Sequence, residues 1–256
     1  MTVTTSATVK VRTPELRAAL AAVFPHRKRT KRDDDIALHR VRLILANGTA
    51  YVGATQGTTT ALARMKYLPL KDGGDTRGNL WEPDDGPLVI DLRPDVVKLW
   101  LQMFAAARMG KDEDLDPVTA ITYAHAAGEV EFENIGGGQS AGERFVINLD
   151  DPHELFPDLI EMTGRALAEA DATNAPRVLK QDPKILALFK DAGQQYGAPV
   201  RIRPTGNAPG SGFVIECGSA FVGTVSSEQG DEGTKKDNQL TLDWLGELKP
   251  RKLASA

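Results

Sequence analysis

Hydrophobic and polar positions along the chain change their period in the same order three times. An extended apolar run comes first, an amphipathic stretch of helical period follows, and short alternating runs come last. Each change from strand to helix falls on a proline phrase: Thr13–Leu16, Arg93–Val96 and Asp182–Ile185. Proline has no N–H to lose at the first helical position, and it favours extended geometry in the residue before it. We therefore predict a strand–helix–strand–strand unit, used about three times.

The same pattern predicts the individual elements. The first predicted helix is apolar at Leu16, Leu20, Val23 and Phe24, which share one face. Another is expected to begin at an Asp151 cap and to run to about residue 170, with a kink at Pro157. All predicted helices are 14–24, 94–108, 151–170 and 183–196. The predicted strands are 4–12, 38–45, 49–54, 58–67, 88–92, 118–125, 129–133, 144–149, 177–180, 199–203, 212–217 and 220–225.

Composition excludes some classes of protein. The chain has 256 residues, 41% of them hydrophobic, and a formal net charge of −4. This balance excludes a uniformly basic protein that coats nucleic acid, but it allows a single basic face. Cys217 is the one cysteine, so no intramolecular disulfide can form. No signal peptide is evident, and no apolar run approaches the ~20 residues of a membrane span. We expect a cytoplasmic protein.

No pattern of catalytic or metal-binding residues stands out. The histidines, at 26, 39, 125 and 153, share no metal-ligand spacing. The glycine run 136–138 lacks the lysine and hydroxyl residue of a phosphate loop. The basic run 27–32 could contact phosphate, and the acidic runs 33–35 and 112–114 could bind a cation, but we favour solvated loops for all three. The expectation is a protein that is not an enzyme and that uses no metal or cofactor.

Several phrases resemble the bacterial DNA sliding clamp family, the β subunit of DNA polymerase III. They are Leu16–Val23 followed by Leu38–Leu43, the segment Phe156–Leu159, and the segment Phe213–Val225. The likeness spreads over residues 6–227, and the chain resembles a divergent and shortened member. The resemblance implies an α+β fold of repeated βαβββ units, with antiparallel sheets outside and helices on the inner face. Such clamps close into rings of twelve units around duplex DNA.

The resemblance also implies which residues would face DNA. Lysine and arginine on the inner helices of a clamp meet phosphates without reading bases. The cations on the predicted helices are the candidates: Arg17, Lys98, Arg108, Arg165, Lys184 and Lys190.

Domain organisation departs from the family pattern. Residues 1–150 hold two units, whereas residues 151–227 hold one complete unit and a helix, as a second, reduced domain. Residues 228–256 form a polar, flexible tail. Its residues Gln239, Leu240, Leu242 and Trp244 are similar to the peptide with which polymerases and repair proteins dock on bacterial clamps. The alternative is a short amphipathic helix that packs on its own domain.

Three functions remain open. The first is a sliding-clamp-like processivity factor that self-associates and tethers DNA polymerase or other replication proteins on duplex DNA. The second is a clamp-derived adaptor without a ring, docking on another clamp through its tail. The third is an enzyme of unrelated α+β fold, against which the missing catalytic pattern argues.

Overall fold

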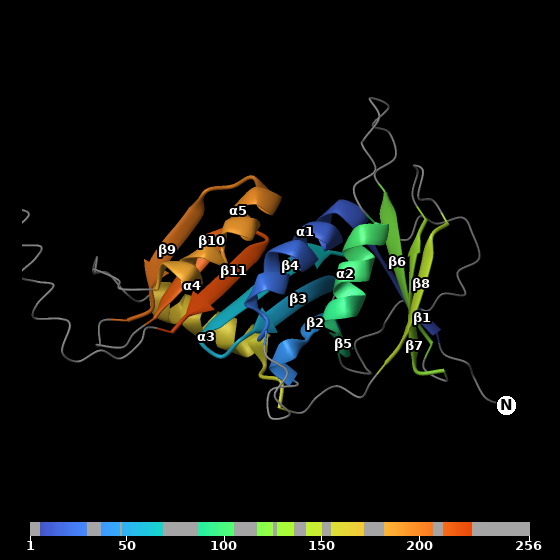
Figure 1. The fold of residues 1–256 in the computed structure, drawn as a ribbon, viewed down its shortest axis with the longest axis horizontal. Coiled ribbons are helices and arrows are strands. Elements are labelled where there is room, and N and C mark those ends of the chain that lie inside the picture. The colour runs from blue at the N-terminus through green and yellow to red at the C-terminus, as the bar shows by residue number, and fades with distance from the viewer. Residues whose placement is uncertain are drawn as a thin grey trace, which may run out of the picture.

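The computed structural model describes residues 6–29, 37–46, 48–68, 87–104, 117–124, 127–135, 142–149, 155–171, 182–206 and 212–226 (Figure 1). The helices are α1 (Thr13–Val23), α2 (Pro94–Met103), α3 (Leu159–Asp171), α4 (Pro183–Ala187) and α5 (Lys190–Tyr196). The strands are β1 (Ser6–Arg12), β2 (Val41–Ala46), β3 (Thr49–Thr55), β4 (Thr59–Lys66), β5 (Leu88–Leu92), β6 (Val118–Ala124), β7 (Glu129–Asn134), β8 (Arg144–Asn148), β9 (Val200–Pro204), β10 (Phe213–Cys217) and β11 (Phe221–Val225).

Two antiparallel sheets hold these strands. The order is β1-β6-β7-β8 in the four-stranded sheet and β5-β2-β3-β4-β11-β10-β9 in the seven-stranded sheet. The opening strand of each of the first two units pairs with the other unit, because β1 lies beside β6 and β5 lies beside β2. The third unit joins edge to edge through β4 and β11. The predicted α+β fold of repeated βαβββ units with antiparallel sheets is confirmed.

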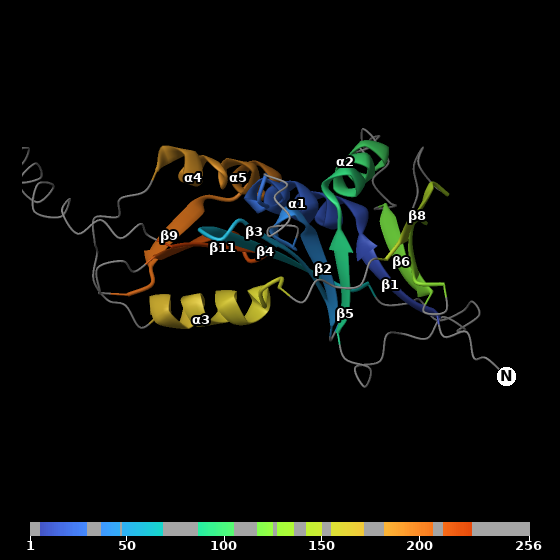
Figure 2. The ribbon, with the colours of Figure 1, turned by 60° about the horizontal axis from the view of Figure 1, so that its bottom comes forward.

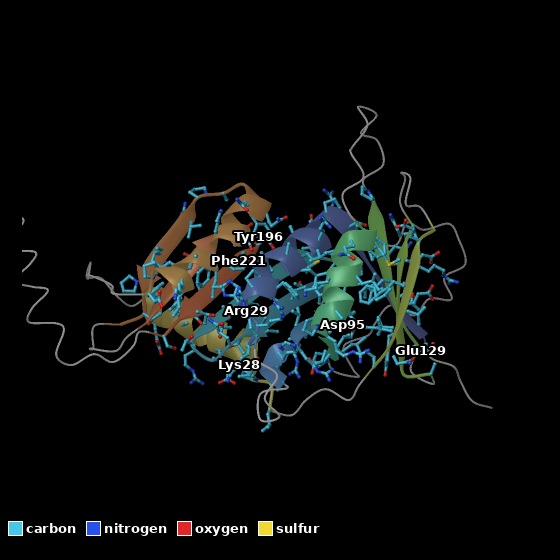
Figure 3. All side chains as sticks on the ribbon, viewed as in Figure 1. Lys28, Arg29, Asp95, Glu129, Tyr196 and Phe221 are labelled. Atoms are coloured by element: carbon cyan, nitrogen blue, oxygen red, sulfur yellow. The ribbon has the colours of Figure 1, made fainter. Side chains whose placement is uncertain are left out.

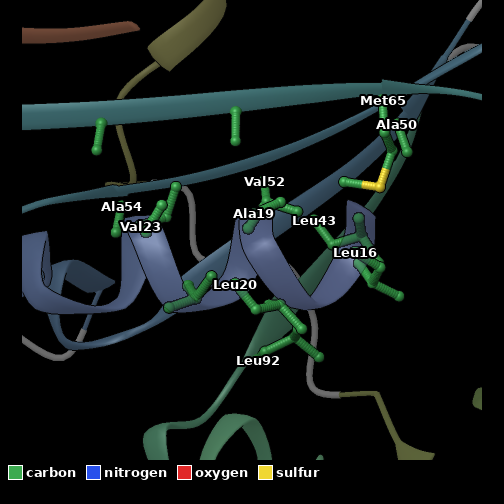
Figure 4. Close-up of a cluster of buried hydrophobic side chains, with 14 of the residues drawn as sticks. Leu16, Ala19, Leu20, Val23, Leu43, Ala50, Val52, Ala54, Met65 and Leu92 are labelled. Carbon is green, nitrogen blue, oxygen red and sulfur yellow. The ribbon is translucent and has the colours of Figure 1, made fainter. Parts of the chain in front are cut away.

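The main core lies between α1 and one face of the seven-stranded sheet. Side chains alternate along a strand, so Val52 and Ala54 of β3 and Ala61 of β4 point to this face. Ala19 and Val23 of α1 face them, and Figure 4 shows the helix lying along this alanine-rich surface. Small side chains on the strands allow the helix to approach closely. Helix α5 of the third unit packs beside α1, so the core continues across the β4–β11 joint.

A second, smaller cluster lies on the opposite face of the same sheet. It consists of Ala37, Leu62, Phe156 and Leu159, all buried, with Tyr51 packed against them. The Phe156 ring lies 4.1 Å from the guanidinium carbon of Arg42. Helix α3 is therefore fastened to the face that α1, α2, α4 and α5 leave open (Figure 2). One helix thus lies on the other side of the sheet from the rest.

The start of α3 differs from the sequence prediction. Residues 155–158 are not helical, and the backbone N–H of Glu161 donates to Asp158 Oδ1 at 2.9 Å. Asp158 therefore caps the helix, and Pro157 precedes it instead of kinking it. The expected beginning at Asp151 was wrong for residues 155–158, and residues 151–154 lie outside the described chain.

The predicted helix 183–196 is divided into α4 and α5. A turn at Leu188 and Phe189 separates them and turns the Phe189 ring into the core. That ring lies 4.5 Å from the ring of His26, centroid to centroid. A methyl group on Gly223 would collide with it, so the glycine makes room for the phenylalanine. The packing of Phe189 in the core therefore explains why the helix is interrupted between α4 and α5.

Several predicted features lie outside the described residues. They are the loop 71–86, the glycine run 136–138, the strand 177–180 and the tail 228–256. No described helix is long and apolar enough to cross a membrane.

Candidate nucleic-acid interface

Four helices share one face of the molecule, which we call the helical face. It consists of the outward sides of α1, α2, α4 and α5, all on the same side of the seven-stranded sheet in Figure 2. Each proline phrase begins one of these helices: Pro14 opens α1, Pro94 opens α2 and Pro183 opens α4. Because each unit places its helix on the same side of the sheet, repetition of the unit produces the helical face.

Three of the predicted DNA-facing residues lie exposed on this face. They are Lys98 on α2, Lys184 on α4 and Lys190 at the start of α5. Lys184 follows the Asp182 cap, whose carboxylate accepts the Lys184 backbone N–H at 2.8 Å. The structure brings these lysines to one side of the sheet, although they come from units separated along the chain.

Arg17 lies on the same side but has a structural partner. Its Nη1 donates to the backbone oxygens of Leu101 at 2.5 Å and Phe104 at 3.3 Å. These carbonyls end α2, where a cation also favours the helix dipole. Arg17 thus ties α1 to α2, and this contact occupies part of its guanidinium.

The remaining predicted residues do not join the set. Arg165 is exposed on α3, on the opposite face of the sheet, and its Nη2 lies 2.6 Å from Glu161 Oε1. Arg108 and the tail residues Gln239, Leu240, Leu242 and Trp244 lie outside the described residues. The six predicted cations therefore do not form one surface.

Sequence reasoning undervalued the cations that follow α1. Arg29 is exposed beside the C-terminal end of this helix, with Lys28 next to it (Figure 3). Arg27 stacks 3.5 Å from the Phe24 ring centroid and donates from Nη1 to the Phe24 carbonyl at 2.7 Å. Burial, and next the charge of Arg29, lower the pKa of Arg27. The sequence could have indicated that these cations lie near α1, because the basic run directly follows the first predicted helix.

The helices on the two sides of the seven-stranded sheet differ in charge. The four helices of the helical face carry four basic side chains against three acidic ones, Glu15, Asp95 and Asp191, a balance of +1. Helix α3 carries Arg165 against Glu161, Glu169 and Asp171, a balance of −2. The helical face can offer a few sequence-independent phosphate contacts, each weak and sensitive to salt.

The buried ionisable groups serve packing. Burial lowers the pKa of His26 to about 4, partly offset by the backbone of Leu188, and His26 Nδ1 lies 3.4 Å from Thr59 Oγ1. Burial also raises the pKa of Cys217 and Tyr196. Among the described residues, no group of three or more His, Cys, Asp or Glu side chains is placed to hold a metal ion.

Comparison with known proteins rests on structure alone. No protein-family model matches the sequence, and no curated protein matches it. The fold matches the DNA polymerase III β subunit of Thermotoga maritima with a TM-score of 0.57 at 12% identity, covering 89% of this chain and 66% of that one.

Two other bacterial β-subunit structures also match this fold. The β subunit of Pseudomonas aeruginosa gives a TM-score of 0.55 at 11% identity, covering 90% of this chain and 68% of that one. A putative β subunit from Eubacterium rectale gives 0.57 at 10% identity, covering 90% and 67%. The chain thus spans about two thirds of the length of the clamps it matches. It has the fold of the bacterial DNA polymerase III β sliding clamps, in a divergent and shortened form.

Proposed function

We propose that the chain is a clamp-like processivity factor. It is not an enzyme. It self-associates, surrounds duplex DNA with its helical face, and tethers DNA polymerase or other replication proteins there without reading sequence. The architecture carries the proposal. The first two units exchange their opening strands between two antiparallel sheets, and four helices lie on one side of the seven-stranded sheet (Figure 2). In this reading residues 1–150 form the first domain and residues 151–227 the reduced second domain.

Self-association is supported by the two ends of the molecule. Strand β8 is an edge of the four-stranded sheet and β9 is an edge of the seven-stranded sheet, at opposite ends in Figure 1. An unpaired edge is a template for another chain. At β9 the side chains of Val200 and Ile202 are 41% and 50% exposed, and Val146 on β8 is 51% exposed. Pairing β9 of one copy with β8 of the next joins unlike surfaces, and such head-to-tail contacts form a ring when the rotation between copies closes.

Charge favours the same pairing. Along β7 the side chains of Glu129, Glu131 and Glu133 alternate with buried Val130 and Phe132, so they line the side of the sheet away from the core. On β9 two basic side chains occupy the corresponding outer side, because Arg201 is opposite Glu216 and Arg203 is opposite Val214. Arg203 is paired with Glu216 (Nε to Oε2, 2.8 Å) and Glu131 with Arg144, so Arg201 at one end and Glu129 and Glu133 at the other supply the charge difference.

The experiment is a charge swap at the two ends. Arg201→Glu should reduce the mass of the full-length assembly towards that of the 27.6 kDa chain, measured by light scattering. Adding Glu133→Arg to the same chain should restore the assembly, since the two charges are again opposite. Lys98→Glu on the helical face is the matched control and should leave the mass unchanged. Equal masses for all variants would contradict the proposed interface.

A second candidate function is an adaptor that forms no ring and docks on another clamp through residues 239–244. It is favoured by the chain spanning only about two thirds of the matched clamps. A peptide of the tail should then bind a bacterial clamp, as measured by calorimetry. Absence of binding would remove this function and leave the first.

A further inference from the structure

A cavity of about 330 Å³ lies between α3 and the outer face of the seven-stranded sheet. Its apolar lining comes from Tyr51 of β3, Leu62 of β4, Val222 of β11, and Ile160 and Leu167 of α3. A cavity of this size and lining suits a few apolar side chains more than a charged ligand. It is separate from the helical face.

The α3 wall of the cavity lacks a side chain at one position, and beside it lies a polar atom with no hydrogen-bond partner among the described residues. A Cβ placed on Gly164 would meet no atom within 4 Å, so the helix leaves space there. Thr163 is 3% exposed, and its Oγ1 has no hydrogen-bond partner among the described residues. An unsatisfied buried hydroxyl costs about 1–3 kcal/mol. A backbone amide or carbonyl entering the cavity would satisfy this hydroxyl.

We propose that the chain's own segment 240–245, Leu-Thr-Leu-Asp-Trp-Leu, occupies this cavity. Its three leucines and its tryptophan supply the apolar groups, and its backbone supplies a partner for Thr163. In that arrangement Asp243 would come near Arg64, an exposed cation on the cavity wall whose Nε donates to the Ser219 carbonyl at 3.0 Å. The proposal holds whether or not the protein acts on DNA.

Chain length permits this docking. The described chain leaves the sheet at Ser226, whose N–H donates to the Thr58 carbonyl at 3.0 Å. Val222 on the cavity wall is four residues earlier on the same strand, which is about 13 Å at the rise of a strand. Residues 227–239 are all polar or glycine, and a flexible coil of that length spans about 20 Å. The segment can therefore reach the cavity of its own chain.

Tethering makes even a weak contact effective. A short flexible linker gives an effective concentration in the millimolar range. An intrinsic dissociation constant of about 0.1 mM would therefore leave the segment bound roughly nine-tenths of the time. A partner that uses the cavity would have to displace it.

The test is the fluorescence of Trp244 in the full-length protein. Subtracting the emission of Trp244→Phe from that of the unchanged protein isolates this residue from Trp81 and Trp100. We expect a blue-shifted emission that does not depend on protein concentration. Gly164→Phe fills the cavity from its open wall, and the shift should then be lost. Met162→Phe places the same ring on the exposed side of α3 and should preserve it.

A second variant protects the test against misfolding of α3. Leu242→Asp alters only the tail and should also abolish the blue shift. An emission typical of water in the unchanged protein would overturn the proposal. So would a blue shift that survives Gly164→Phe, or one that appears only at high protein concentration, which would indicate docking on a second copy.

Discussion

The two faces of the seven-stranded sheet show how one set of strands supports two very different layers. On the helical face, α1 and α5 pack over alanine, valine and phenylalanine side chains in a core that runs through all three units. On the outer face, Leu159 attaches α3 to the buried residues Ala37, Leu62 and Phe156, and the helix lies beside a cavity. The helical face therefore holds the fold together, whereas α3 is a local attachment. Substitutions on the two faces should therefore have different effects.

The largest difference should come from matched leucines on the two faces. Leu16 and Leu159 are each 1% exposed. Leu16→Ala leaves a void in the main core and should lower the free energy of unfolding by about 2–5 kcal/mol. Leu159→Ala should cost less than about 2 kcal/mol, because α3 can detach locally. Urea denaturation with far-ultraviolet circular dichroism measures both. Equal losses would show that the two layers unfold as one.

Acid should weaken the joint between the first and third units. The pKa of His26 is lowered from 6.5 to about 4 in the folded protein, so the unfolded protein binds more protons between these values. Stability should therefore fall as pH decreases from 6.5 to about 4, by up to about 3 kcal/mol, and this contribution should be constant above 6.5. His26→Phe keeps a ring beside Phe189 and removes the titration. The comparison is made by urea denaturation across this window, and a parallel decline in both proteins would contradict the assignment.

Attachment of α3 should depend on a glycine in β3. A methyl group on Gly53 would collide with Leu159 Cδ1, the flexible end of that side chain. Gly53→Ala should therefore weaken the docking of α3 by about 1 kcal/mol. Adding Leu159→Ala removes the collision, so the cost of the double variant should be less than the sum of the single costs. Hydrogen exchange of α3 measures the docking, and simple additivity would disprove contact between these two residues.

The smallest expected effects concern cations on the two faces. Lys98→Gln and Lys184→Gln should each reduce the salt dependence of duplex DNA binding by about one phosphate contact. Arg165→Gln, on the outer face, should leave it unchanged. Fluorescence anisotropy over a series of salt concentrations gives the slopes. If only Arg165→Gln decreased the salt dependence, DNA would bind the outer face and the proposal would be contradicted.

Much of the fold was predictable because its signals are local. The proline phrases mark where α1, α2 and α4 begin, and alternation marks most of the strands. Strand order required the structure, since β1 pairs with β6 across more than one hundred residues of sequence. The hydrophobic pattern also predicted one continuous helix over residues 183–196. Packing of Phe189 against His26 and Gly223 interrupts it, so that α4 and α5 are separate.

The candidate interface was less predictable. Helical cations can be recognised in the sequence, but the side of the sheet on which each helix lies cannot. Lys98 and Arg165 look alike in the sequence and lie on opposite faces. Arg17 looks like a free surface cation, yet its partners are the last carbonyls of another helix. These outcomes depend on tertiary contacts that no local pattern records.

If copies of this chain close into a ring with the helical face inside, negative-stain electron microscopy of the purified full-length protein should reveal it. We expect closed rings with a central hole wide enough for duplex DNA, and we expect Arg201→Glu to abolish them. Single compact particles at every protein concentration would contradict encirclement by this protein alone.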